Sequence, residues 1–280
     1  MDTKLVPKPV LDRLKRHPRA YQAARKVRMG LGRVIPPRTV DGIPGRVHFN
    51  DFMLEDASME GVEAYRERAL NVLRNVDATL AAAGKDFGEV RSWLDFGCGY
   101  GRVVRFLVER TPPERVWASD VIEEAVEFCA EEFGVHPLYS TASIQDLELP
   151  RFDFVYMVSV ITHLSEESSR DLLRRIPDWL EHGGIVMFTT HGEWSLANLS
   201  SYGDLYEEMR ARIEREVRER GVSFVPYHHY GGDDYGMTWH SHDHIRETMR
   251  ELHGDSLRLV RFEPQGLDEH QDVFAYLRVA

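Results

Sequence analysis

The feature that most constrains the fold is an alternation of short apolar runs with amphipathic segments between residues 92 and 190. Strands that are apolar at nearly every position, separated by helices, are typical of a parallel sheet buried on both faces. Because such connections are right-handed, the alternation predicts a doubly wound α/β sandwich. We expect strands near 92–97, 115–119, 137–140, 152–160 and 184–190, and helices near 101–110, 123–133 and 166–181.

Further elements are expected on either side of this alternation. Residues 58–83 carry apolar positions at helical spacing, with Ser58 as N-cap and Gly84 as terminator. Residues 203–221 predict a highly charged helix, and 222–244 are expected to form a loop rich in Gly, Tyr and His. The final runs LRLVRF and DVFAYLRV predict an antiparallel hairpin, which completes a seven-stranded, mostly parallel sheet.

The length of 280 residues allows one sizeable core with an appended arm or lid. We divide the chain into a basic N-terminal arm, 1–57, and one α/β domain, 58–280, with a lid or insertion at about 192–245. The formal net charge is −11, which argues against nucleic acid as a partner because phosphate binding needs a basic surface.

The charge is unevenly distributed along the chain. Residues 1–46 hold 12 Lys and Arg against 3 acidic residues, a net charge of +9, which leaves −20 for the remainder. Such an arm can contact a membrane surface, an anionic partner or the acidic body of its own protein, or simply remain solvated. No apolar run has the length of a signal peptide or a transmembrane segment, and Cys98 and Cys129 are the only cysteines. We therefore expect a cytoplasmic protein without disulfides.

The stretch WLDFGCGYGRVVRF, residues 93–106, follows the first strand of the alternation. In a doubly wound sheet, ligands bind at the carboxyl ends of the strands. Gly97, Gly99 and Gly101 let the backbone turn sharply and approach a ligand closely, and the next helix offers free amides. The spacing is GxGxG rather than the GxGxxG of dinucleotide-binding loops, with Arg102 at the position of the last glycine.

Two carboxylates refine the choice of ligand. Asp95 lies at the same end of the strand, where it would repel a pyrophosphate but suits an ammonium group. Asp120 ends the run VWASD, 19 positions beyond Gly101, where a carboxylate can accept both ribose hydroxyls. Together these residues predict a site for a nucleoside that carries an ammonium group.

These motifs resemble the class I S-adenosylmethionine-dependent methyltransferases, whose glycine motif typically reads LDxGCGxG. The resemblance covers roughly residues 58–190 and the terminal hairpin. It implies that S-adenosylmethionine is the cofactor, that Asp95 and the Gly97–Gly101 loop hold its methionine half, and that Asp120 holds its ribose. It also implies that Cys98 in this loop is a small packing residue rather than a nucleophile.

The resemblance extends to the adenine end of the cofactor. In TASIQDLELP, Ser143 and Ile144 occupy the adenine-contact positions. Many family members have Asp in place of Ser143, so Gln145 or Asp146 is an alternative adenine contact. Arg102 is expected near the cofactor carboxylate, or else as a solvent-facing helix residue. The remaining cofactor-binding residues that we expect are Val121 and Val158.

The stretch SVITHLSEE places His163 after the fourth strand, beside the expected methyl group. The family often has a histidine there, and two roles remain open. His163 is either the catalytic base that takes a proton from the acceptor, or a hydrogen-bonded structural histidine. Ser165 is expected to cap the next helix, with Ser168 at N3 and acidic residues in its first turn.

Further histidines lie in the predicted lid. His191 follows the fifth strand, and we expect it to bind substrate together with Tyr235, Trp239 and His240. The glycines Gly231, Gly232 and Gly236 allow the lid to move or simply form turns. A metal site is also suggested by a cluster of histidines, namely His228, His229, His240, His242 and His244. Ser241 as a helix N-cap explains the HSHDH spacing without one, so we expect no metal.

The predicted reaction is methyl transfer from S-adenosylmethionine to a small-molecule acceptor. The approach segment GRVIPPRTVDGIPGRVHFNDFM and the SVITHL motif resemble bacterial methyltransferases associated with glycosyltransferases and natural-product tailoring, which favours a hydroxyl, or an amine, of a sugar or natural product. The alternatives are a protein or peptide methyltransferase and a non-catalytic cofactor-binding partner. A nicotinamide-dependent oxidoreductase is disfavoured by Asp95 and Arg102.

Overall fold

The computed structural model describes residues 14–141, 143–202, 205, 207–228 and 234–279. Its centre is a seven-stranded sheet in the order β10-β11-β7-β6-β3-β4-β5. Only β11 runs antiparallel to the other six, since it pairs antiparallel with both β7 and β10. The strands are β3 (Trp93–Phe96), β4 (Val116–Asp120), β5 (His136–Tyr139), β6 (Phe152–Met157), β7 (Leu180–Thr190), β10 (Leu257–Leu267) and β11 (Gln271–Arg278).

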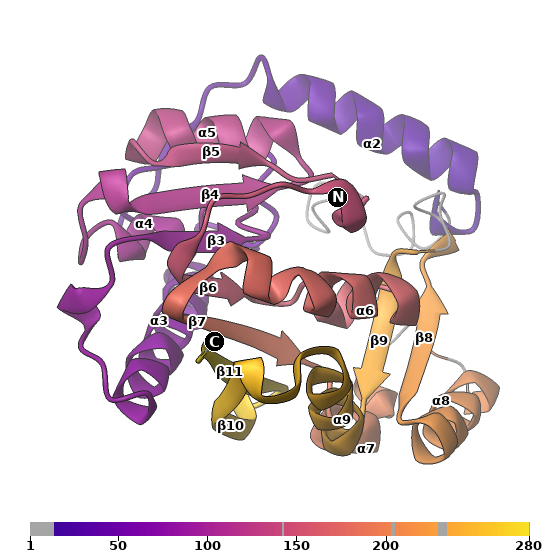
Figure 1. The fold of residues 1–280 in the computed structure, drawn as a ribbon. Coiled ribbons are helices and arrows are strands. Elements are labelled where there is room, and N and C mark those ends of the chain that lie inside the picture. Colours follow the sequence, from indigo (N-terminus) through magenta and orange to yellow (C-terminus); the bar gives the residue numbers. More distant parts are fainter. Residues whose placement is uncertain (1–13, 142, 203–204, 206, 229–233, 280) are drawn as a thin grey trace.

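Helices cover both faces of this sheet (Figure 1). One face packs against α3, α4 and α5, and the other packs against α6 and α9. The helices are α2 (Pro18–Gly32), α3 (Met59–Ala82), α4 (Val104–Leu107), α5 (Glu123–Phe133), α6 (Glu166–Arg175), α7 (Glu193–Ala197), α8 (Glu207–Arg220) and α9 (His242–His253). The predicted doubly wound α/β fold is confirmed.

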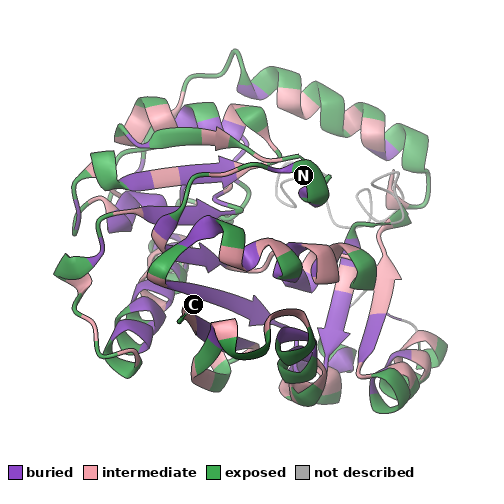
Figure 2. Cartoon of the chain, in the orientation of Figure 1, coloured by how far each residue is buried: buried purple, intermediate pink, exposed green. Residues whose placement is uncertain are grey.

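The two cores follow from side chains that alternate along each strand. In β3, Trp93 packs with α3 and α4, whereas Leu94 and Phe96 pack with α6 on the opposite face. Figure 2 shows the sheet buried beneath helices whose outer faces are exposed. The strand order reverses between β3 and β6, so the carboxyl ends of these two strands form the edge where such folds bind ligands.

Local capping signals set several helix boundaries. Ser58, Ser165 and Ser241 each accept a hydrogen bond from the backbone N–H three residues later, as N-caps do. The predicted helix at 123–133 is confirmed at both ends, because Gly134 follows with a left-handed φ of 70°. The helix expected at 101–110 is shorter and spans Val104–Leu107 alone.

The expected loop at 222–244 is wrong. It contains an antiparallel hairpin of β8 (Val222–Pro226) and β9 (Gly236–His240), which packs against α8 around Trp239. Gly231 and Gly232 of the predicted lid, and His229, lie outside the described residues. The hairpin is joined to the main sheet, since His240 N–H donates to the His191 carbonyl at the end of β7, 2.9 Å away.

The N-terminal arm is ordered where the structure describes it, and it packs on the glycine-loop side. After α2 it forms the two-stranded hairpin of β1 (Arg38–Thr39) and β2 (Arg46–Val47). The fully buried Arg105 guanidinium donates to the Pro44 and Arg46 carbonyls at 2.9 and 3.1 Å, and to the Gly101 carbonyl at 3.2 Å. One buried cation thus joins the arm to the glycine loop.

Candidate cofactor and acceptor site

The glycine loop connects β3 to the short helix α4. Gly97, Gly99 and Gly101 all have positive φ, at 90°, 51° and 77°. A Cβ on Gly97 would lie 2.6 Å from Val160 Cγ2, and one on Gly101 would lie 2.8 Å from the Phe133 ring. These two positions therefore need glycine for both conformation and space. The loop presents bare backbone at the carboxyl end of β3.

Asp120 lies at the end of β4 and accepts two backbone hydrogen bonds. Its Oδ2 accepts from Gly99 N–H and its Oδ1 accepts from Ile122 N–H, each at 2.9 Å. Burial raises the pKa of Asp120, while these donors lower it. The carboxylate is thereby fixed beside the glycine loop.

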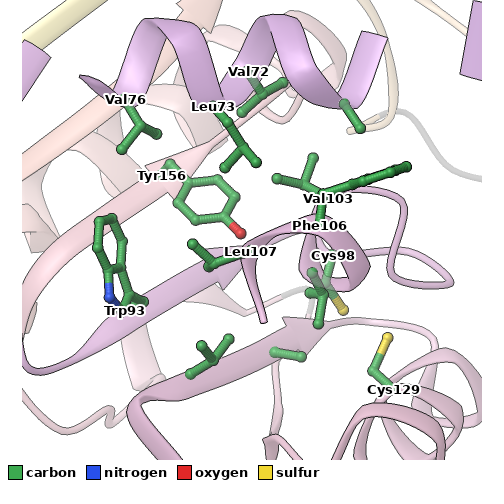
Figure 3. Close-up of a cluster of buried hydrophobic side chains, with 14 of the residues drawn as sticks. Val72, Leu73, Val76, Trp93, Cys98, Val103, Phe106, Leu107, Cys129 and Tyr156 are labelled. Carbon is green, nitrogen blue, oxygen red and sulfur yellow. The ribbon is translucent and has the colours of Figure 1, made fainter. Parts of the chain in front are cut away.

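Asp95 is buried beneath the same loop, and its Oδ2 has no hydrogen-bond partner. The pKa of Asp95 is raised to about 7, chiefly because the carboxyl group is buried. The negative charge of Asp120 also raises this pKa, whereas the Tyr156 hydroxyl and Arg102 lower it. Asp120 therefore lies close enough to Asp95 to disfavour a second negative charge there. Figure 3 shows the Tyr156 hydroxyl directed toward the Cys98 end of the buried cluster. The Tyr156 hydroxyl is the nearby donor that acts on Asp95, although neither Asp95 Oδ2 nor this hydroxyl has a partner at standard hydrogen-bond geometry.

Cys98 belongs to the hydrophobic core and is inaccessible. It is buried, as is Cys129 of α5, and both thiols lie near the Gly99 carbonyl at 3.3 and 3.6 Å. Hydrogen bonding to Cys129 and burial raise the pKa of the Cys98 thiol well above its usual range. A protonated, buried thiol is a poor nucleophile, which agrees with a packing role.

The structure distinguishes between the candidates for the adenine contact. Gln145 is turned away, because its amide donates to Asp171 of α6 at 2.6 Å. Asp146 instead accepts a hydrogen bond of 2.8 Å from the Ser143 hydroxyl, so these two side chains lie together. Ile144 is buried in the core beside them, whereas Val121 after β4 is 63% exposed. Asp146 remains the candidate for a polar contact.

Two histidines are held in the same tautomer by β9. His163 Nδ1 lies 2.8 Å from the Gly236 carbonyl, and His191 Nδ1 lies 3.2 Å from the Thr238 carbonyl. A carbonyl oxygen can only accept, so each Nδ1 carries the proton and each neutral ring keeps an Nε2 lone pair. Burial lowers the pKa of His163. Burial and the neighbouring His163 move the pKa of His191 well below its usual range. Both rings are neutral at physiological pH.

Aromatic rings surround these histidines. The ring of His163 lies 5.5 Å from that of Tyr235 and 6.1 Å from that of Tyr227. The centre of the His191 ring lies 5.7 Å from that of Tyr202 and 5.3 Å from that of His270. Tyr235 is 43% exposed, whereas His191 is 3% exposed. Tyr235 is therefore the exposed ring of this group, His191 is buried, and His163 is half-buried, as are Tyr202, Tyr227 and His270.

Trp239 and His240 lie further inside. Trp239 is fully buried in the core formed with α8. The ring of His240 is buried beside that of His244 in α9, and burial lowers the pKa of His240 to about 3. Both therefore support the hairpin from within, and neither has the exposure that the predicted wall of the substrate pocket requires. Within the described residues, no group of three or more His, Cys, Asp and Glu side chains is arranged to hold a metal ion.

Two polar groups on the same sheet edge were not predicted. Ser159, just after β6, has a φ of 57°, which is unusual for a non-glycine residue. Its N–H donates to Thr189 Oγ1 at 2.9 Å, and Thr189 Oγ1 donates to Gln271 Oε1 at 2.6 Å. The Tyr202 hydroxyl bonds His270 Nε2 at 2.8 Å. Of these features only the positive φ of Ser159 is unusual, and the sequence carries no signal for it.

Solved structures of other proteins share this fold. A methyltransferase of Clostridium acetobutylicum described as S-adenosylmethionine-dependent matches over 77% of this chain and 92% of its own, with a TM-score of 0.52 and 13% identity. Magnesium protoporphyrin IX methyltransferase of Synechocystis, with bound S-adenosylhomocysteine, matches over 80% and 89%, with a TM-score of 0.51 and 16% identity. The fold is that of the class I S-adenosylmethionine-dependent methyltransferases.

Residues 94–184 match the family model described as "Methyltransferase domain". A malonyl-[acyl-carrier protein] O-methyltransferase of Acetivibrio thermocellus is 25% identical over 126 residues. That alignment covers 43% of this chain and 42% of the relative, so the chain matches less than half of the relative's length. S-adenosylmethionine is the cofactor of the class. No helix in the described part of the chain combines the length and apolarity needed to cross a membrane.

Proposed function

We propose that this protein transfers the methyl group of S-adenosylmethionine to a neutral hydroxyl, or an amine, of a small-molecule acceptor such as a sugar or natural product. His163 acts as the base. The observation that carries this proposal is the 2.8 Å bond from His163 Nδ1 to the Gly236 carbonyl. It leaves the Nε2 lone pair of a neutral imidazole to receive a proton on the acceptor side.

The cofactor supplies an electrophilic methyl group on a sulfonium. Asp95 and the Gly97–Gly101 loop hold its ammonium and methionine backbone, Arg102 neutralises its carboxylate, and Asp120 binds its ribose. The unpartnered Oδ2 of Asp95 supports this assignment, because a buried acceptor atom gains most from a cationic donor. Ser143, Ile144, Asp146 and Val121 border its adenine, and Val158 lies at the methyl-bearing end.

Catalysis in such a site is mainly positioning. Holding two reacting groups in line gives effective concentrations of about 10⁵ to 10⁸ M. A general base adds about 10² to 10⁴. The Tyr227 and Tyr235 rings beside His163 can stack on a flat or sugar-like acceptor, and they carry no fixed charge. The two named relatives act on a malonyl-acyl-carrier protein and a magnesium porphyrin, so the shared fold leaves the acceptor to the residues around His163.

The role of His163 is tested with His163→Ala and a matched control, His182→Ala. His182 is an exposed histidine on β7. Binding of S-adenosylmethionine is measured by calorimetry, and methyl transfer by labelled cofactor against a panel of phenols, sugars and amines. We expect His163→Ala to lose about 10² to 10⁴ in turnover with cofactor affinity unchanged, and His182→Ala to change neither. A His163→Ala variant that loses only thermal stability contradicts the role of base.

The cofactor half is tested separately. Wild-type protein must give a heat of binding with S-adenosylmethionine, whichever acceptor is used. No heat at any pH between 6 and 8 would overturn the whole proposal. Cofactor binding without turnover on any small molecule, but with turnover on a peptide, would instead move the acceptor class and leave the cofactor assignment intact.

A further inference from the structure

α2 carries an exposed apolar stripe that belongs to none of the three hydrophobic clusters in the described chain. Val27, Leu31, Val34 and Ile35 are 64%, 44%, 74% and 36% exposed. Their spacing of i, i+4, i+7 and i+8 places them on one helical face. The last two residues follow the end of α2, but their N–H groups still bond the Leu31 carbonyl at 3.1 and 2.9 Å. The stripe is therefore continuous.

A row of cations runs beside this stripe. Arg19, Lys26 and Arg33 are exposed and recur at i, i+7 and i+14, so they share one side of the helix. None of the three forms an ion pair with another residue in the described ranges. An exposed apolar stripe bordered by basic residues is the pattern of a helix that lies in the plane of a lipid interface.

The face of α2 next to this stripe holds the helix against the body. Tyr21 is buried, and the Arg28 guanidinium donates to Asn50 Oδ1 at 3.4 Å and to the Phe49 carbonyl at 3.5 Å. A Cβ on Gly32 would lie 2.0 Å from the Asn50 side chain, so the two segments are in close contact. The apolar stripe is thus presented outward from a fixed base.

We propose that the outer face of α2 binds the surface of an anionic lipid membrane. Residues 1–46 carry +9 and the rest of the chain carries −20, so an anionic surface attracts the arm and repels the body. This separation of charge orients the molecule with α2 toward the lipid. Figure 1 shows α2 as an outer helix beyond α5 and β5, which leaves it free to meet a flat surface.

A lipid surface fits this face better than a folded protein partner. One side of a 15-residue helix is about 22 Å long and about 10 Å wide. A standard protein interface buries about 800 Å² on each partner, which exceeds what this side offers. An interfacial helix needs only its apolar stripe in the headgroup boundary and its cations beside the phosphates.

The test uses the full chain and co-sedimentation with vesicles of phosphatidylcholine alone or with phosphatidylglycerol added. Two double variants alter the face: Lys26→Glu with Arg33→Glu, and Leu31→Ser with Val34→Ser. The matched control is Arg258→Glu with Leu259→Ser, an exposed basic and apolar pair on the β10 edge of the sheet, opposite β5. Calorimetry with S-adenosylmethionine checks that each variant is folded.

We expect partition to the anionic vesicles only, weakened by salt. Reversing both charges should reduce it by about thirtyfold or more, since each cation near such a surface contributes about fivefold. The serine pair should reduce it by about tenfold or more, and the control should match wild type. Absence of partition, an equal loss in the control, or binding that ignores phosphatidylglycerol overturns the proposal. So does light scattering that shows a dimer, dissociated by the serine pair, without vesicle binding.

Discussion

Replacing Asp95 by Asn should stabilise the cofactor-free protein and weaken cofactor binding. Burial raises the pKa of Asp95 from 3.8 to about 7. Because the folded pKa is raised, the ionised form costs stability: the cost is absent below the pKa of the unfolded chain, grows between about pH 4 and pH 7, and is complete above pH 7. A rise of this size corresponds to about 4 kcal/mol. Asn removes the charge at nearly the same volume.

The stability effect is measured by urea unfolding at pH 8 and pH 5. We expect Asp95→Asn to raise the free energy of unfolding by up to about 4 kcal/mol at pH 8, and by less than about 2 kcal/mol at pH 5, where the folded protein already holds the proton. The control is Asp255→Asn, an exposed carboxylate that should change stability at neither pH.

The binding effect has the opposite sign. If the ionised carboxylate receives the ammonium of the cofactor, the wild-type Kd rises about tenfold for each pH unit below 7, and binding releases a proton there. In Asp95→Asn the Kd should not depend on pH, and the binding free energy at pH 8 should be less favourable by about 1.5 to 3 kcal/mol. Calorimetry in buffers of different ionisation enthalpy reports both the Kd and the number of protons released on binding. Equal destabilisation at both pH values, together with an unchanged Kd, would refute this account of Asp95.

Three further outcomes are expected. Asp120→Ala should weaken S-adenosylmethionine binding by about 1.5 to 3 kcal/mol in calorimetry, and unchanged affinity would remove Asp120 from the ribose. Arg105→Met should lower the free energy of unfolding by about 3 to 5 kcal/mol, because it leaves the carbonyls of the arm without their donor and removes the positive charge beside the buried Asp51; an unchanged urea midpoint would count against the arm's attachment. Gly236→Ala should slow methyl transfer while cofactor affinity is kept, because its Cβ would lie 2.1 Å from the Val225 carbonyl and displace the strand that holds His163; an unchanged rate would show that β9 does not orient this ring.

Sequence predicted the elements whose signals are local. The strand Val116–Asp120 and the helix Glu123–Phe133 are bounded by apolar runs, acidic first turns and a terminal glycine, all within a few residues. The region of the candidate cofactor site could be predicted for the same reason, since the loop and Asp120 occupy one βαβ unit. The helix expected at 101–110 is shorter because its first turn belongs to the glycine loop, where Gly101 has a positive φ of 77°.

The parts that sequence missed depend on distant contacts. The hairpin of β8 and β9 consists of short strands in a segment whose Gly, Tyr and His content resembles a loop, and packing of Trp239 against α8 determines its formation. The bond from His163 to Gly236 spans 73 positions of the chain. No local pattern specifies such a partner, so sequence left His163 between a structural and a catalytic role.

The glycine-loop half of the candidate site depends on contacts that are local in the sequence, whereas the histidine half depends on contacts between distant segments. The two halves can therefore vary independently. The cofactor-side contacts of Gly99 and Asp120 close within one βαβ unit, and changes elsewhere leave them intact. The imidazoles of His163 and His191 both bond alternate carbonyls of β9, which project from the same edge of a strand. A shift of that hairpin by one residue would move both partners together. Acceptor choice can therefore change through the hairpin while cofactor binding is retained.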